Sequence, residues 1–228
     1  MNLNRTRFLA AACIALLFVI ANPLLAEPLL LPGLGVVEVD NLQIVTFESG
    51  DDWEEYSSPN GVDLSIENGV YRAYTANPGY VWGLNDVEHT DVVVEAEVTP
   101  LTIYTENGAG VMCRADTRNN GDGYYFMINA NGYFSIRMGQ GNDIPALVDW
   151  RRSSAINTGL DRNVIRAVCL GNELAMYING ELVALVRDST YSSGFAGLAI
   201  AAGSNSVDMA FDNVTLYDIT LRTPTTPA

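Results

Sequence analysis

Aromatic and arginine side chains alternate with apolar ones along several short segments of the chain, a pattern that suits the recognition of sugars. Aromatic rings stack on the apolar faces of sugars, and planar polar groups fix the hydroxyls. The candidate binding residues are Trp82, Arg114, Tyr125, Asn129, Arg137, Trp150 and Tyr177. An ordinary half-solvated sheet face would carry the same residue types, because Tyr and Trp favour strands for packing reasons alone.

Carboxylate pairs that could cleave a glycosidic bond are scarce, and we assign no catalytic residue. Cleavage needs two carboxyl groups roughly 5–9.5 Å apart on either side of the bond. Glu95 and Glu97 share one face of the segment 91–99, but the alternate residues are apolar, so we expect both glutamates to face water. His89 is the only histidine and the chain has no Gly-x-Ser-x-Gly sequence, so we expect His89 on a surface loop.

Composition narrows the class of protein. The 228 residues include 27 acidic and 12 basic ones, every basic residue is arginine, and the formal net charge is −15. This charge disfavours nucleic-acid binding, and the 48% hydrophobic content excludes a disordered chain. The length suits one domain with a substantial core. The acidity either keeps an exported protein soluble and monomeric or reflects a saline habitat.

The N-terminus is predicted to be a secretory signal peptide over residues 1–26. Arg5 and Arg7 precede a short apolar run, and Ala26 follows at a small-residue end. Cleavage after Ala21 is an alternative, and so is an uncleaved membrane anchor, although the run is near the lower limit for spanning. The protein is therefore expected to be secreted or in the cell envelope, with no membrane contact after cleavage and a net charge of −17.

Two cysteines, Cys113 and Cys169, remain after the predicted cleavage. An even number of cysteines in an oxidising compartment suggests a disulfide. Two small buried thiols are the alternative, because free cysteine is itself among the most buried residue types.

The middle of the chain predicts strand after strand, and no stretch shows a sustained helical period. The expected strands are 42–48, 62–66, 70–76, 80–84, 91–99, 108–116, 123–130, 132–139, 144–150, 162–170, 173–179, 181–187, 196–202 and 206–218. Asn-Gly pairs, which favour tight hairpins, occur at 68–69, 131–132 and 179–180. We expect an all-β antiparallel sandwich over 42–219, after a lead-in linker over 27–41 and before a Thr/Pro-rich tail over 220–228.

Alternation assigns side chains to faces of the expected strands. The core set includes Phe126, Ile136 and Ile178, and both cysteines fall on core faces. Tyr125, Arg137 and Tyr177 fall on the opposite, partly polar faces, where a ligand would meet them. Arg114 is placed on such a face as well, opposite Cys113.

Several segments along the expected strands form a recognisable series. They are NGAGVMCRADTRNNGDGYYFMINANGYFSIRMG over 107–139, LVDW over 147–150, NVIRAVCLG over 163–171, LAMYING over 174–180, Ser193-Gly194 with Gly197-Leu198, and FDNV over 211–214. In this order they resemble concanavalin A-like (laminin-G-like) jelly rolls of exported bacterial proteins, and they are similar to the 3-keto-disaccharide hydrolase (DUF1080-like) family. The resemblance covers roughly 44–218. It implies two antiparallel sheets, one concave, with sugar-type ligands on the concave side or at the loop rim.

The resemblance also implies a metal and a partner. Many such modules hold a calcium ion where the first and last strands meet, and Glu48 and Asp212 resemble the ligand pair. The function that we expect is a monomeric carbohydrate-binding module without catalysis, whose partner is a glycan or cell-surface polysaccharide. The alternatives are a glycoside hydrolase of the 3-keto-disaccharide hydrolase type and a structural or adhesion module of the cell envelope, because this fold hosts several functions.

Overall fold

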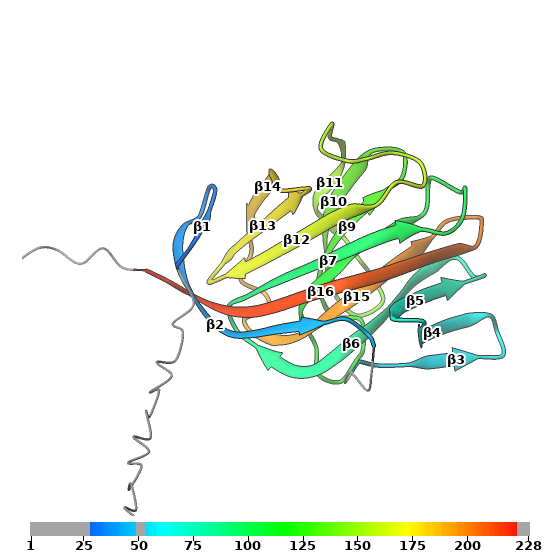
Figure 1. The fold of residues 1–228 in the computed structure, drawn as a ribbon, viewed down its shortest axis with the longest axis horizontal. Helices are drawn as coiled ribbons and strands as arrows, with labels where there is room; N and C mark the ends of the chain where they lie inside the picture. Colours follow the sequence, from blue (N-terminus) through cyan, green and yellow to red (C-terminus); the bar gives the residue numbers. More distant parts are fainter. Residues whose placement is uncertain (1–27, 49–52, 223–228) are drawn as a thin grey trace, which may run out of the picture.

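A computed structural model describes residues 28–48 and 53–222, and all regular elements within them are β-strands (Figure 1). The predicted all-β sandwich is confirmed: two antiparallel sheets, of ten and six strands, pack face to face. No helix in the described residues is long and apolar enough to cross a membrane. The predicted signal peptide lies outside the described residues and stays a prediction.

The ten-stranded sheet has the order β14-β13-β12-β7-β16-β5-β4-β3, and β2 pairs with both β16 and β1. Its strands are β1 (Leu29–Leu31), β2 (Gly35–Val45), β3 (Tyr56–Ser58), β4 (Val62–Glu67), β5 (Val70–Thr75), β7 (Val92–Pro100), β12 (Asn163–Leu170), β13 (Glu173–Ile178), β14 (Glu181–Arg187) and β16 (Val207–Leu221). β16 therefore lies between strands from distant parts of the chain.

The six-stranded sheet has the order β11-β10-β9-β8-β15-β6. Its strands are β6 (Gly79–His89), β8 (Gly108–Ala115), β9 (Gly123–Asn129), β10 (Tyr133–Gly139), β11 (Ala146–Arg152) and β15 (Gly194–Ala202). β6 is the edge strand next to β15, and in Figure 1 it runs along the side of the molecule that also carries β3 and β4.

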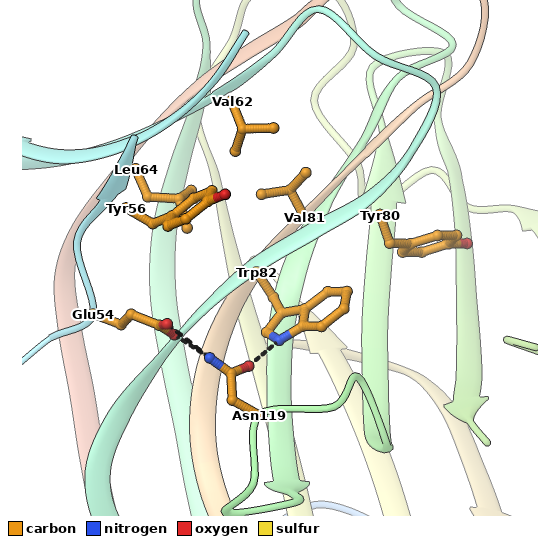
Figure 2. A pocket seen from close by; sticks show the side chains of 8 residues that line it. All are labelled: Glu54, Tyr56, Val62, Leu64, Tyr80, Val81, Trp82 and Asn119. Atoms are coloured by element: carbon orange, nitrogen blue, oxygen red, sulfur yellow. Dashed lines mark hydrogen bonds between the residues drawn. The ribbon is translucent and has the colours of Figure 1, made fainter. Parts of the chain in front are cut away.

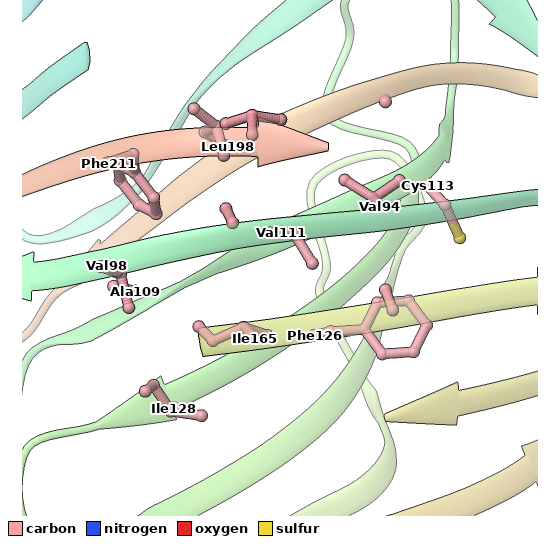
Figure 3. Packing of buried hydrophobic residues seen from close by; sticks show 14 of the residues in the cluster. Val94, Val98, Ala109, Val111, Cys113, Phe126, Ile128, Ile165, Leu198 and Phe211 are labelled. Atoms are coloured by element: carbon pink, nitrogen blue, oxygen red, sulfur yellow. The ribbon is translucent and has the colours of Figure 1, made fainter. Parts of the chain in front are cut away.

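The predicted core faces meet between the two sheets (Figure 3). Phe126, Ile136 and Ile178 are fully buried there, as alternation predicts. The hairpin turns follow from the predicted Asn-Gly pairs. Asn68 and Gly69 between β4 and β5 both have positive φ, as do Asn179 and Gly180 between β13 and β14, and Asn and Gly tolerate this conformation best.

The segment expected as a lead-in linker is instead part of the fold. β1 and most of β2 lie within it, and β2 continues the sheet by pairing with β16. Leu31 and Val37 are fully buried, and together with Tyr177 and Val168 they belong to a second apolar cluster, separate from the main core. The prolines and glycines of this segment misled the prediction, because they mark a tight β1–β2 turn rather than a loose chain.

The two cysteines form a disulfide that links the sheets, as predicted. Cys113 lies on β8 and Cys169 on β12, with their Cα atoms 6.7 Å apart and a sequence separation of 56. The bond therefore joins an interior strand of each layer, near the C-terminal end of both strands.

Arg114, predicted to face a ligand, is instead 1% exposed and ties the two layers together at one end. The strand pairing shifts register between β8 and β15 at this point, and Arg114 adopts a φ of 51°. The bulge turns its side chain toward the loops of the other sheet. Its guanidinium donates to the carbonyl oxygens of Thr90, Gly171 and Tyr191 and to the Asp91 carboxylate, at 2.8–3.0 Å. Burial lowers the pKa of Arg114.

Removal of the disulfide should lower the free energy of unfolding by about 2–4 kcal/mol, because a closed loop of this length restricts the unfolded chain. The measurement is urea unfolding of the wild type with and without reductant, beside the double variant Cys113→Ala/Cys169→Ala. The double variant should be insensitive to reductant. Equal stability of the oxidised wild type and the double variant would contradict the expectation.

Arg114→Met should lower the free energy of unfolding by about 3–5 kcal/mol, because three carbonyls and a carboxylate lose a buried charged donor. The control is Arg187→Met, which breaks a largely exposed ion pair with Glu173 and should cost under about 1 kcal/mol. Urea unfolding of both variants tests the difference. Similar small effects would show that Arg114 does not tie the layers together.

Candidate functional site

The seven predicted binding residues do not form one surface. Tyr177 lies on β13 of the ten-stranded sheet, whereas the other six lie on strands of the six-stranded sheet. Tyr177 is covered by the β1–β2 hairpin: it is 1% exposed and its hydroxyl donates to the Pro32 carbonyl at 2.6 Å. Tyr177 lies on the face of β13 opposite the main core, as predicted, but the β1–β2 hairpin buries it.

Most of the predicted residues on the six-stranded sheet serve the fold. Tyr125 is fully buried and donates to the Gly121 carbonyl at 2.7 Å, and burial raises the pKa of its phenol. The Asn129 amide oxygen accepts from two backbone N–H groups in the β9–β10 turn. Arg137 donates to the Ile144 carbonyl, and Trp150 packs on the cluster that covers the outer face of this sheet.

Trp82 is the predicted residue that lines the cavity beside edge strand β6. The cavity has a volume of about 270 Å³ and lies where edge strand β6 meets β3 and β4 (Figure 2). Its wall is mainly aromatic and aliphatic, with one carboxylate and one amide. The lining residues are Glu54, Tyr56, Val62, Leu64, Tyr80, Val81, Trp82 and Asn119.

A chain of hydrogen bonds fixes Trp82 at the rim. The indole Nε1–H donates to the Asn119 amide oxygen, and the Asn119 Nδ2 donates to both oxygens of Glu54 at 2.7 Å (Figure 2). Tyr125 meets the indole edge-on at 6.3 Å between centroids. Gly121 lies so close that a Cβ there would be 2.9 Å from the ring. The indole is therefore held from several sides, and its polar atom is satisfied within the protein.

The loop that carries Asn119 is braced at its base. Asn119 has a φ of 53°, a conformation that asparagine tolerates better than most residues. Arg118 donates to both oxygens of Asp116, and these hydrogen bonds lower the pKa of Asp116 to about 2. The carboxylate therefore stays charged, and the loop stays braced, down to strongly acidic pH.

Glu54 is placed by the contact between the two sheets. Its backbone N–H donates to the Leu84 carbonyl on β6, and its carbonyl accepts from the Tyr71 hydroxyl on β5 at 2.6 Å. Trp53, beside it, forms an isolated bridge with Asn85. The backbone on which Glu54 stands is therefore anchored to both layers.

A second cavity, of about 350 Å³, adjoins the first and shares Glu54 and Asn119 with it. It contains a second acid, Asp86, and two aromatic residues. The lining residues are Trp53, Glu54, Leu84, Asn85, Asp86, Asn119 and Phe195. We refer to the two cavities together as the β6-edge groove.

The predicted outward position of Glu95 and Glu97 on β7 is confirmed. Each pairs with an arginine of the neighbouring β12: Arg166 donates to Glu95 at 2.6 Å, and Arg162 pairs with Glu97. Neither glutamate lines the β6-edge groove. Ion pairs on the outside of the sandwich account for both residues.

The expectation for His89 is wrong, because it is 2% exposed at the end of β6. Its Nδ1 is 2.8 Å from Asp218 and its Nε2 is 3.2 Å from the Asn85 amide nitrogen. The Asn85 oxygen accepts from the Ala196 N–H, which leaves the amide nitrogen to donate to the imidazole. Nδ1 therefore carries the proton and donates to Asp218. The residue joins strands of both sheets.

The predicted calcium ligands are separate from any cluster of donors. Within the described ranges, no three His, Cys, Asp or Glu side chains gather where they could hold a metal ion. Asp212 accepts from the N–H of Asn213, and the Glu48 carboxylate lies against Gly69. These positions do not assemble a carboxylate-rich site, and calcium stays a prediction from the family resemblance.

Sequence reasoning missed Glu54, Tyr56, Tyr80 and Asn119. The Asn119-Asn120-Gly121 run is typical turn composition, and nothing in it indicates that the turn reaches Trp82. Tyr80 is two residues from Trp82 on one strand and therefore on the same face, a signal that could have linked them. Tyr56 belongs to β3 of the other sheet and Glu54 lies just before that strand, so alternation within β6 could not find them.

Comparisons with known proteins show the fold. No family model and no curated protein matches the chain. Among solved structures, the carbohydrate-binding module CBM66 from Bacillus subtilis has a TM-score of 0.59 at 17% identity, over 73% of this chain and 95% of that one. A Bacillus licheniformis β-glucanase has a TM-score of 0.55 at 10% identity, over 78% and 97%.

A prokaryotic β-1,3-1,4-glucanase (lichenase) derived from a mouse hindgut metagenome is similar as well, with a TM-score of 0.57 at 11% identity, over 78% of this chain and 98% of that one. The similar structures thus include a binding module and glycoside hydrolases. The described part of the chain has the concanavalin A-like jelly-roll fold.

Asn119→Ala should release the Trp82 indole without unfolding the domain, because it removes the acceptor of the Nε1–H. The chain has three tryptophans, so three indole N–H signals are expected in an NMR spectrum. Exchange of the Trp82 signal with solvent should accelerate. The Trp53 signal is the internal control, because its N–H is buried and donates to the Gly83 carbonyl. Unchanged exchange at Trp82 would contradict the proposed anchoring.

Proposed function

We propose that the protein is an exported carbohydrate-binding module without catalysis of its own, and that it binds a glycan in the β6-edge groove. The observation that carries this proposal is the immobilised Trp82 at the rim of an aromatic cavity. Binding to a rigid platform loses little side-chain entropy, since the indole is ordered before the ligand arrives.

The lining of the groove suits the two kinds of surface that a sugar presents. The ring of Trp82, with Tyr56 and Tyr80 nearby, offers apolar surface for the C–H face of a pyranose or furanose ring. Glu54 and Asn119 offer oxygen atoms that accept from sugar hydroxyls. A few polar groups beside a larger apolar wall are typical of small-ligand sites.

The comparisons support a carbohydrate as the ligand class. The similar structures are by name a carbohydrate-binding module and β-glucanases, and they cover most of this chain. The disulfide supports export, because such bonds persist mainly in oxidising compartments. The comparisons and the disulfide therefore agree with the sugar-binding chemistry of the groove lining.

Glycoside hydrolysis is the second candidate, and one observation favours it. Two carboxylic residues, Glu54 and Asp86, line the same cavity, and hydrolysis requires two carboxyl groups around the bond. Release of reducing sugar that disappears in Glu54→Gln would replace the first proposal by this one. Binding without release supports the first.

Trp82→Ala should weaken glycan binding about tenfold or more, because central aromatic anchors carry much of the binding free energy. Affinity electrophoresis against a panel of soluble polysaccharides, followed by calorimetry on the best ligand, measures the change. Tyr74→Ala is the matched control: Tyr74 lies on β5 beside Arg72 and lines neither cavity, so binding should be unchanged.

Absence of binding to every glycan in the panel would reject the proposal and favour a structural or adhesion role in the cell envelope. Binding that survives Trp82→Ala at full strength would place the glycan elsewhere on the molecule. Thermal melting of both variants checks that each remains folded.

A further inference from the structure

We infer that the β6-edge groove selects uncharged oligosaccharides long enough to span both cavities, and that it rejects glycans carrying carboxylate or sulfate groups. The inference rests on the proposed function and adds the chemical class and minimum length of the ligand. Charge, hydrogen bonding and the continuity of the two cavities carry it.

The groove has acidic groups and no basic ones among its described lining residues. Glu54 and Asp86 are the two acids, and every other lining residue is aromatic, aliphatic or an amide. The chain as a whole has no lysine. A carboxylate or sulfate on the ligand would find no positive charge on these walls.

The Glu54 carboxylate accepts hydrogen bonds from uncharged protein donors. Its oxygens accept from the Asn119 amide at 2.7 Å and from the Leu84 N–H at 3.4 Å. Among the ion pairs of the described residues, none involves Glu54. No cationic side chain of the described residues therefore offsets this carboxylate at the groove.

Arg118, next to Asn119 in the chain, does not change this balance. It donates to both oxygens of Asp116 within its own loop. To reach a ligand in the groove, its guanidinium would have to leave that pair.

The Glu54 carboxylate strengthens the binding of an uncharged sugar and weakens the binding of a negatively charged one. A hydroxyl donates to the Glu54 carboxylate, and a hydrogen bond to a charged acceptor is stronger than one between neutral groups. A uronic acid or sulfated sugar would bring a second negative charge beside the first, and the juxtaposition of like charges at an interface opposes binding. Selectivity therefore comes from repulsion as well as from contact.

The two cavities meet at Glu54 and Asn119, which belong to the lining of both. The first offers Trp82 and Tyr80, and the second offers Phe195 beyond the shared residues. When one sugar unit stacks on Trp82 and hydrogen-bonds to Glu54, the adjacent sugar unit of the same ligand therefore occupies the second cavity. A single sugar would leave one cavity unused.

Calorimetric titration of the intact domain with a set of hexasaccharides tests the charge selectivity. The neutral probes are the β-1,3-, β-1,4- and α-1,4-linked glucose hexamers, and the acidic probe is hexagalacturonate. At least one neutral probe should bind ten times more tightly than hexagalacturonate. Added sodium chloride should strengthen residual binding of the acidic probe, because salt screens repulsion, and leave neutral binding unchanged.

Glu54→Gln keeps the size of the side chain and removes its charge. It should narrow the gap between hexagalacturonate and the best neutral probe at least threefold. Hexagalacturonate binding as tightly as the neutral probes in the wild type would overturn the inference while the proposed function stands. Failure of all probes to bind would overturn both.

Phe195→Ala tests the length requirement. It should weaken the best hexasaccharide at least fivefold and leave the disaccharide of the same series unchanged. Equal effects on both ligands, or no effect on either, would overturn the claim that the ligand spans both cavities. Phe195→Leu, which retains bulk, checks that any loss comes from the cavity wall rather than from misfolding.

Discussion

Both sheets of this sandwich are apolar on both sides at their centre, and each outer face therefore needs a cover of its own. On β8 and β9 the residues directed away from the main core, such as Met112, Met127 and Tyr125, are as fully buried as those directed toward it. Aromatic side chains of the six-stranded sheet provide one cover, and the β1–β2 hairpin provides the other. Residues that strand alternation places on an outer face are therefore buried by these covers and cannot contact a ligand.

That constraint explains what the sequence could and could not predict. Alternation placed Phe126, Ile178 and both cysteines on core faces, because these assignments depend only on the period of a strand. The exposure of Tyr177 and His89 depends on segments far away in the chain, namely the β1–β2 hairpin and the strand that carries Asp218. Arg114 depends on a bulge that no local pattern marks.

The candidate site lies at the edge of the six-stranded sheet, where the aromatic cover of its outer face ends. On edge strand β6, Trp82 belongs both to this aromatic cover and to the wall of the β6-edge groove. Asn119, on a loop, and Glu54, just before β3, hold it in place. The sequence identified Trp82 as a candidate, whereas Asn119 and Glu54, which hold it through hydrogen bonds, could be identified only from the tertiary structure.

The position of β16 has a consequence for the order of folding. This strand, the last of the described chain, pairs with β7, β5 and β2, whose residues precede it by more than a hundred positions. Until it is synthesised, the ten-stranded sheet is split along its middle and the edges of β5 and β7 have no neighbour there. Such long-range pairing slows folding, so the domain completes its structure only after the residues of β16 have been made.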